Sequence, residues 1–249
     1  MERLSELRAR LDDLDTELVR VVAERLAVCR EVAEVKAAAN STVIQPARVA
    51  QVITSRRELA SASGVDPEFA EALFRVILAE THRIEAADHR RHEPAAPVDK
   101  PPPDTALQIT AARIDHVVLA VADLKLALDH LVNQLGFRLR EAPSRAADIA
   151  VLDAGGVELV LVQRADDTGV YHVGIEVLDG DYVRRAFVER GVRLATPMVM
   201  GADGRQEFLT ARDDALGVRF AVVSRTGGRS GSDAQGVRAL LDAVTDPDS

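Results

Sequence analysis

The sequence predicts two domains of different class, a helical N-terminal domain at residues 1–92 and an α+β C-terminal domain at 112–226. Leucine and valine recur every three or four positions over the first 38 residues, and strand-like alternation is absent up to about residue 92. Residues 93–111 are rich in proline and predict an extended linker. The C-terminal part contains two copies of one strand–helix–strand pattern, which predicts a duplicated fold.

The first helix is expected from about residue 3 to residue 38. Its apolar seam consists of Leu4, Leu7, Leu11, Leu14, Leu18, Val21, Val28, Val32 and Val35. A helix of this length spans roughly 54 Å, more than a small domain can cover, so we expect a homodimer with two such helices side by side.

Arg25 takes a position within this apolar seam. Its guanidinium cannot lose its proton, so it needs an anionic partner inside the bundle. That partner is either a buried Asp or Glu of the protein or a carboxylate of a ligand. We favour the ligand.

Two further helices complete the N-terminal domain. Pro46 suits the first turn of a helix that extends to about residue 62, and Gly64 follows it. Asp66 is expected to cap a third helix that begins at Pro67 and ends near residue 90.

Cationic side chains are spaced to meet around a small anion. Arg25 and Lys36 are about three turns apart and share a face. Arg8 precedes Arg25 by roughly 25 Å along the axis, so only the Arg8 of a partner subunit could reach the same ligand. Arg48 opens the second helix.

Thr81 and Glu85 lie one turn apart on the third helix, which adds a hydroxyl and a carboxyl to the same pocket. The predicted pocket suits a small dianion.

Residues 1–90 resemble the all-helical chorismate mutase family, which shares its fold with isochorismate-pyruvate lyases. The stretches that carry the resemblance are Leu7-Arg8, Ala23-Glu24-Arg25, Val35-Lys36, Arg48, and Leu73-Phe74 followed by Thr81 and Glu85. The family rearranges chorismate to prephenate without a cofactor, by holding the enolpyruvyl arm over the ring and stabilising charge on the ether oxygen.

The resemblance implies a role for each matching residue. Arg8 of the partner subunit and Arg25 would bind the two carboxylates, and Lys36 would donate to a carboxylate and to the ether oxygen. Arg48 would complete the cationic lining, and Thr81 would contact the ring carboxylate.

Three positions depart from the family pattern. Glu85 stands where many members have Gln, and a glutamate donates a hydrogen bond to the ether oxygen only when it is protonated. Val49 stands where the family has a glutamate that holds the C4 hydroxyl, and Gln45 also replaces a frequent acidic residue.

These departures leave the substrate open. The alternative substrates for the rearrangement are isochorismate and 4-amino-4-deoxychorismate. Two other functions also remain open: elimination of pyruvate from isochorismate, and a non-catalytic role as a ligand sensor.

The C-terminal repeat predicts two βαβββ modules. Residues 114–121 and 170–177 begin the two copies, and each copy continues through a helical stretch to Gly-x-Arg-Leu, at 136–139 and 191–194. Further strands are expected at 147–153, 156–163, 206–212 and 217–223. Residues 227–249 predict a tail with a short helix at about 236–244.

His116 and His172 occupy equivalent positions in the two modules and are candidate ligands of a divalent metal, with Glu158 as a candidate third ligand. About residues 113–224 resemble the vicinal-oxygen-chelate superfamily, which includes glyoxalase I. Ala221 stands where that superfamily has a glutamate ligand. A working metal site and a cleft that has lost its metal both remain open. His82 and His130 are expected on the surface.

The composition limits the kinds of partner that the protein is expected to bind. A net charge of −9 argues against binding to nucleic acid or to acidic membranes. The single cysteine, Cys29, excludes an internal disulfide. No signal peptide and no long apolar run are evident, so a cytoplasmic location is expected.

Overall fold

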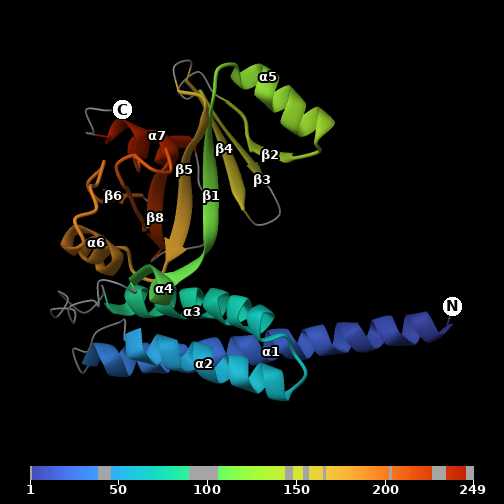
Figure 1. The fold of residues 1–249 in the computed structure, drawn as a ribbon. Coiled ribbons are helices and arrows are strands. Elements are labelled where there is room, and N and C mark those ends of the chain that lie inside the picture. The colour runs from blue at the N-terminus through green and yellow to red at the C-terminus, as the bar shows by residue number, and fades with distance from the viewer. Residues whose placement is uncertain are drawn as a thin grey trace.

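The computed structural model contains a helical domain and a sheet domain, and α3 lies between the sheet domain and the pair α1 and α2 (Figure 1). The structure describes residues 2–38, 46–89, 106–143, 148–153, 157–164, 167–201, 204–225 and 234–244. The predicted fold class is confirmed: an all-helical N-terminal part and a C-terminal part with one mixed sheet.

The three predicted helices form α1 (Glu2–Ala38), α2 (Pro46–Ala62) and α3 (Pro67–His89). Asp66 caps α3 as predicted, because its side chain accepts a hydrogen bond from the backbone N–H of Phe69 at 2.9 Å. Gly64 adopts a φ of 72°, which favours glycine and reverses the chain between α2 and α3.

The helical domain has a small core and a long uncovered helix. Val49, Val52, Ile53 and Leu78 form the core between α2 and α3. The N-terminal half of α1 runs on past the other two helices (Figure 1). The leucine–valine seam is therefore exposed in the single chain; Leu11, for example, is 58% exposed.

The C-terminal sheet has eight strands in the order β2-β3-β4-β1-β5-β8-β7-β6. The strands are β1 (Ala111–Val121), β2 (Arg138–Glu141), β3 (Ile149–Asp153), β4 (Glu158–Gln163), β5 (Gly169–Val177), β6 (Val199–Met200), β7 (Arg205–Leu209) and β8 (Arg219–Arg225). The first strand of each module pairs in parallel with the last, β1 with β4 and β5 with β8, and β1 joins β5 antiparallel at the centre. The predicted duplication is confirmed.

The second module is less regular than the sequence predicted. Gly191-Val192-Arg193-Leu194 does not enter a strand comparable to β2. Leu194 forms only a single bridge to Thr210, and β6 has two residues.

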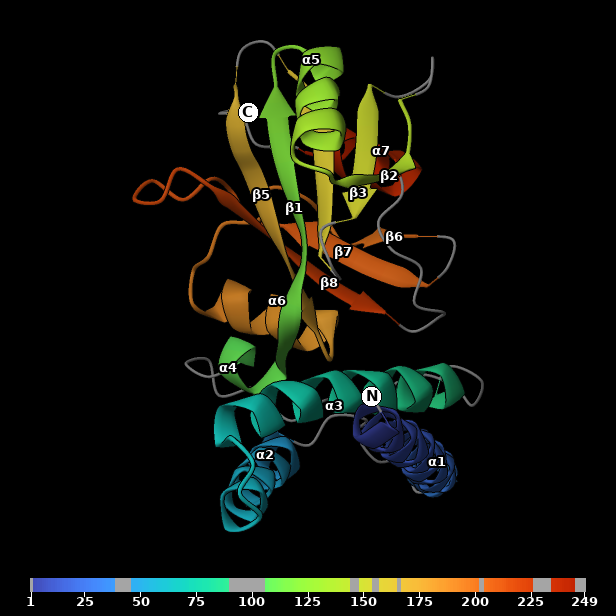
Figure 2. The same ribbon diagram turned by 90° about the vertical axis from the view of Figure 1, so that its right-hand side faces the viewer.

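Helices cover both faces of the sheet. On the outer face, Leu124 of α5 (Leu124–Asp129) packs on Leu152 and Leu161, and a π-helical turn at His130–Gln134 continues α5. α6 (Gly180–Glu189) covers the outer face of the second module. Figure 2 shows α5 in front of the first module and α7 (Ala234–Asp242) behind it.

Two predicted boundaries were wrong. The linker was expected to reach residue 111, but Ala106–Thr110 forms the short helix α4 and Ala111 already begins β1. Residues 93–105 lie outside the described part of the chain. The C-terminal helix begins at 234 rather than 236, and it is a packed element of the domain instead of part of a tail, since Val237 and Leu240 are fully buried.

The two domains are in direct contact. Arg75 of α3 donates hydrogen bonds to the backbone carbonyls of Gln108 and Ala111, at 3.2 and 3.0 Å. Leu178, which follows β5, packs against the core of the helical domain. Among the described residues, no helix combines the length and the apolar character that crossing a bilayer requires.

Candidate functional sites

α1 and α3 bring Arg25 and Thr81 together. Nη1 of Arg25 donates to Oγ1 of Thr81 at 2.8 Å, and it lies 3.7 Å from Sγ of Cys29. Thr81 in turn donates to the carbonyl of Ile77 one turn earlier. Within the described residues, the contacts of the Arg25 guanidinium are thus a hydroxyl and a thiol, and its charge has no carboxylate beside it.

Lys36 and Glu85 meet further along the same two helices, about three turns after Arg25 on α1 and one turn after Thr81 on α3. Nζ of Lys36 lies 2.8 Å from Oε2 of Glu85, whose side chain is 7% exposed. Because Glu85 follows Thr81 by four residues, both side chains lie on the face of α3 that contacts α1. Four of the predicted pocket residues, Arg25, Lys36, Thr81 and Glu85, therefore form one cluster.

The other predicted pocket residues lie apart from this cluster. Arg8 is exposed on the projecting half of α1. Arg48 is exposed and donates to Oε1 of Gln51 at 2.7 Å. Val49 is buried in the core between α2 and α3. Gln45 lies outside the described residues.

The prediction for His82 was wrong, whereas His130 is exposed as expected. His82 is buried beside the pocket cluster, with 6% of its surface exposed. Burial and the nearby charge of Lys36 lower its pKa from 6.5 to about 3, so it is neutral at physiological pH. Leu78, His82 and Glu85 follow one another at steps of four and three, and this helical stripe was the signal that could have placed His82 inside.

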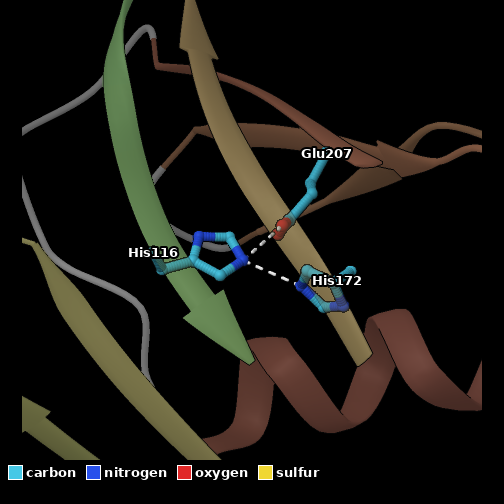
Figure 3. A group of neighbouring side chains, drawn as sticks. All are labelled: His116, His172 and Glu207. Carbon is cyan, nitrogen blue, oxygen red and sulfur yellow. Dashed lines mark hydrogen bonds and ion pairs between the residues drawn. The ribbon is translucent and has the colours of Figure 1, made fainter. Parts of the chain in front are cut away.

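His116 of β1, His172 of β5 and Glu207 of β7 form a second buried cluster (Figure 3). The Nε2 atoms of the two histidines are 2.9 Å apart, and Nε2 of His116 lies 3.5 Å from Oε1 of Glu207. One ligand atom from each of the three residues lies within 4.8 Å of the others.

Neighbouring groups fix the orientation of His116. Its Nδ1 atom lies 2.9 Å from Oδ2 of Asp115, and an ionised carboxylate only accepts, so Nδ1 carries the proton. Burial raises the pKa of Asp115, but the hydrogen bond from His116 and the charge of Arg225 outweigh it and hold that pKa well below its usual range. Gly174 is required beside the ring, because a Cβ there would lie 2.3 Å from the imidazole.

The cluster has the donor set of a metal site. With Nδ1 of His116 protonated, its Nε2 presents a lone pair toward Oε1 of Glu207, and Oε1 has no hydrogen-bond donor among the described residues. Two imidazoles and one carboxylate, with Asp115 behind one imidazole, suit a divalent transition metal with an open coordination position.

Glu158, the candidate third ligand, lies outside this cluster. Glu158 is the Cα partner of His116 on β4, but its carboxylate pairs with Arg140. Glu207 was missed. Glu207 lies in a predicted strand, next to the buried Phe208, and nothing in that strand marks it as a ligand. Only the pairing of β7 with β8, the strand that carries Ala221, brings it into the second module beside the histidines.

The two halves match two different families. Residues 7–86 match the model of chorismate mutase type II, and residues 115–208 match that of the glyoxalase/bleomycin resistance protein/dioxygenase superfamily. This is the fusion that the sequence resemblance implied.

Curated relatives match the helical half. The chain is 39% identical over 82 residues to the 4-amino-4-deoxychorismate mutase of Streptomyces pristinaespiralis. The match covers 33% of this chain and 64% of that protein. The chain is 35% identical over 82 residues, again 33% of this chain, to the T-protein of Enterobacter agglomerans, covering 22% of that protein. The chain thus spans less than two thirds of the length of these two relatives.

The C-terminal half is similar to solved structures. Methylmalonyl-CoA epimerase from Mycobacterium tuberculosis is 26% identical, with a TM-score of 0.39 over 54% of this chain and 94% of that one. A hypothetical protein from Bacillus halodurans is 21% identical, with a TM-score of 0.41 over 49% and 98%.

The buried neutral His82 predicts a stability that depends on pH. Between pH 6.5 and about 3 the unfolded chain binds a proton at this histidine that the folded chain does not, so stability falls as the pH falls. Urea unfolding at pH 7, 6, 5 and 4 should show that the free energy of unfolding of His82→Phe decreases less with falling pH than that of the parent chain. His130→Phe, at an exposed histidine, is the control and should keep the parent slope. Equal slopes in all three proteins would contradict the assignment.

Proposed function

We propose that the helical half catalyses the Claisen rearrangement of a chorismate-type dianion. The observation that carries the proposal is the Arg25–Thr81–Lys36–Glu85 cluster, in which a half-buried guanidinium has a hydroxyl but no carboxylate as its described partner. Two cations on rigid helices can hold the two carboxylates of such a substrate and stabilise the charge that develops on its ether oxygen. The match to the chorismate mutase type II model over the same residues supports this chemistry.

For the ring substituent we propose the 4-amino group as the best fit. Val49 takes the sequence position at which the family has the glutamate that holds the C4 hydroxyl of chorismate, and its apolar side chain is buried in the core between α2 and α3, so the feature that favours chorismate is missing. The similarity to a protein named 4-amino-4-deoxychorismate mutase supports the amino analogue. Chorismate and isochorismate are the alternatives.

Turnover of these three substrates tests the proposal. The purified chain is incubated with each one, and products are identified by mass and ultraviolet spectrum. We expect an isomer of unchanged mass, with the highest kcat/KM for 4-amino-4-deoxychorismate. Release of pyruvate would instead indicate a lyase, and turnover of none of the three would refute an enzymatic role for this half.

Arg25→Met and Lys36→Met should each lower kcat/KM by about 10² to 10³-fold, the usual cost of removing one donor that stabilises developing charge. Arg20→Met is the matched control, because Arg20 is an exposed cation of the same helix that pairs only with Glu17 and Glu24 among its described contacts. A similar loss in Arg20→Met would mean that the effect is non-specific.

We further propose that Glu85 acts in its protonated form. In the ligand-free chain Lys36 balances the charge of the Glu85 carboxylate at 2.8 Å. A substrate anion that engages Lys36 takes away part of this balance, and a buried carboxyl without a cation favours its neutral form. Protonated Glu85 can then donate to the ether oxygen.

This predicts that kcat falls as the pH rises, because deprotonation removes the donor. In Glu85→Gln the amide donates at every pH, so the profile should be flatter from pH 5 to 9. A flat profile in the parent chain would show that Glu85 is not the donor.

We propose that the active form is a homodimer in which Arg8 completes the partner's pocket. The apolar seam of α1 is exposed, and a second α1 beside it would bury this surface. Arg8 is too far along α1 to reach Arg25 of its own chain, but an antiparallel neighbour would bring its own Arg8 there.

Mixed dimers test this arrangement. Arg8→Met and Arg25→Met chains are each expected to be nearly inactive. When they are co-refolded in equal amounts, half of the dimers are mixed and each mixed dimer has one intact pocket, so activity should return to about one quarter of the parent value. If both arginines served a pocket within one chain, mixing would restore nothing.

As a second function, we propose that His116, His172 and Glu207 hold a divalent transition metal. A bound ion would act as a Lewis acid with an open position for an oxygen ligand. The similarity of residues 115–208 to the glyoxalase superfamily supports a metal in this half.

Metal analysis after dialysis against Ni²⁺ or Zn²⁺ should find about one ion per chain, lost in His172→Ala and weakened in Glu207→Gln. Glu158→Gln is the matched control and should keep the ion, because Glu158 pairs with Arg140 outside the cluster. Loss of the ion in Glu158→Gln, with retention in Glu207→Gln, would reverse the assignment of the third ligand.

A further inference from the structure

The inner face of the C-terminal sheet carries a buried cation that has no carboxylate partner within the described part of the chain. Arg219 is 1% exposed, and its Nε and Nη1 atoms have no hydrogen-bond acceptor among the described residues. Its guanidinium lies 5.0 Å from the centre of the Tyr171 ring. A cation–π contact recovers part of the lost hydration of a buried charge, but it satisfies none of the in-plane N–H donors.

The surrounding charges balance without Arg219. Three other arginines of this region, Arg113, Arg205 and Arg225, form ion pairs with the three carboxylates Asp115, Glu176 and Glu207. His172 is the Cα partner of Arg219 on β5. These three carboxylates are therefore already paired, and among the described residues none is left for Arg219, while Arg164 places a further cation 5.0 Å from the centre of the same Tyr171 ring. A buried cation without an anionic partner is unfavourable.

The site also offers features that suit an organic anion. The Tyr171 hydroxyl is a second buried donor without a described partner, and it belongs to the ring that the Arg219 guanidinium contacts. Tyr171 also belongs to an apolar cluster with Val118, Val151 and Val237. A guanidinium fork matches a carboxylate in two-point geometry, and the apolar wall favours a carbon skeleton over an inorganic ion.

Helix α7 seals this region. Val237 packs in the cluster with Tyr171, and Leu240 packs on Leu209 and Ala221 of the second module. The backbone N–H of Ala234, at the start of α7, donates to Oε2 of Glu141 at 3.0 Å. α7 thus packs on the inner faces of both modules. Since Arg219 is 1% exposed, a ligand reaches it only when an element that covers it moves, and we take this nine-residue helix to be that element.

We propose that Arg219 anchors a binding site for a small organic carboxylate on the inner face of the C-terminal sheet, and that α7 is the cover that opens to admit it. The proposal requires neither the reaction of the helical half nor the metal. It assigns to the C-terminal half a ligand of its own.

Binding is tested with butyrate and with inorganic phosphate at constant ionic strength. The full chain carries Tyr182→Phe, because the protein has two tyrosines and no tryptophan, so emission then reports Tyr171 alone. It also carries Arg25→Met, which removes the main guanidinium of the helical pocket. Butyrate should change the Tyr171 emission saturably, and Arg219→Met should weaken its binding at least about tenfold.

The stability of the unliganded chain separates a binding role from a structural one. Replacing an unpaired buried charge by the unbranched apolar side chain in Arg219→Met should leave the urea midpoint unchanged or raised. A lowered midpoint would identify Arg219 as a structural group and overturn the proposal. Absence of butyrate binding, binding of phosphate alone, or equal butyrate binding by Arg219→Met would also overturn it.

Thiol labelling tests the cover. In a Cys29→Ser chain, single cysteines replace Val237 on α7, Val151 on the inner face beneath it, or Leu161 on the outer face beneath α5. If α7 opens by itself, the cysteines at 237 and 151 react at one common rate, and the cysteine at 161 reacts more slowly, only upon global unfolding. One rate with one urea dependence for all three would show that α7 is a fixed part of the core.

Discussion

A cation removed from water needs a negative partner, and both halves of this protein are arranged around that requirement. In the helical half, α1 and α3 hold Arg25 and Lys36 against Thr81 and Glu85. In the C-terminal half, arginines and carboxylates of neighbouring strands pair across the inner face of the sheet. Where the pairing is complete the groups stabilise the fold, and where it is incomplete they are available to a ligand.

In each half one cation lacks a described carboxylate partner, and the surroundings of the two cations differ. Arg25 is half-buried at the edge of a long exposed helix, so a second subunit and a dianion can both complete its surroundings. Arg219 lies against Tyr171, which packs on α7, and the described carboxylates Asp115, Glu176 and Glu207 are already paired with other arginines. The first arrangement suits rapid exchange of substrate and product, and the second suits slower binding that depends on movement of a helix.

α3 connects the two halves physically. It carries Thr81 and Glu85 toward α1, and about two to three turns earlier its Arg75 donates hydrogen bonds to the backbone carbonyls of Gln108 and Ala111 at the start of the sheet domain. Val49, where the family would contact the ring substituent, belongs to the same small core against which Leu178 of the sheet domain packs. A change in the C-terminal half therefore has a path of packed side chains to the core of the helical half, which includes Leu78 of α3.

The sequence by itself determined the local features: three helices from apolar periodicity and capping residues, the duplicated module from its repeated pattern, and the candidate residues Arg25, Lys36, Thr81, Glu85, His116 and His172. These features depend on neighbours a few positions away along the chain. Only the tertiary structure decided that His82 is buried, that Glu207 rather than Glu158 joins the histidines, and that α7 closes the inner face. Strand order and helix packing bring those groups together across long separations, and the pattern within a single segment does not encode them.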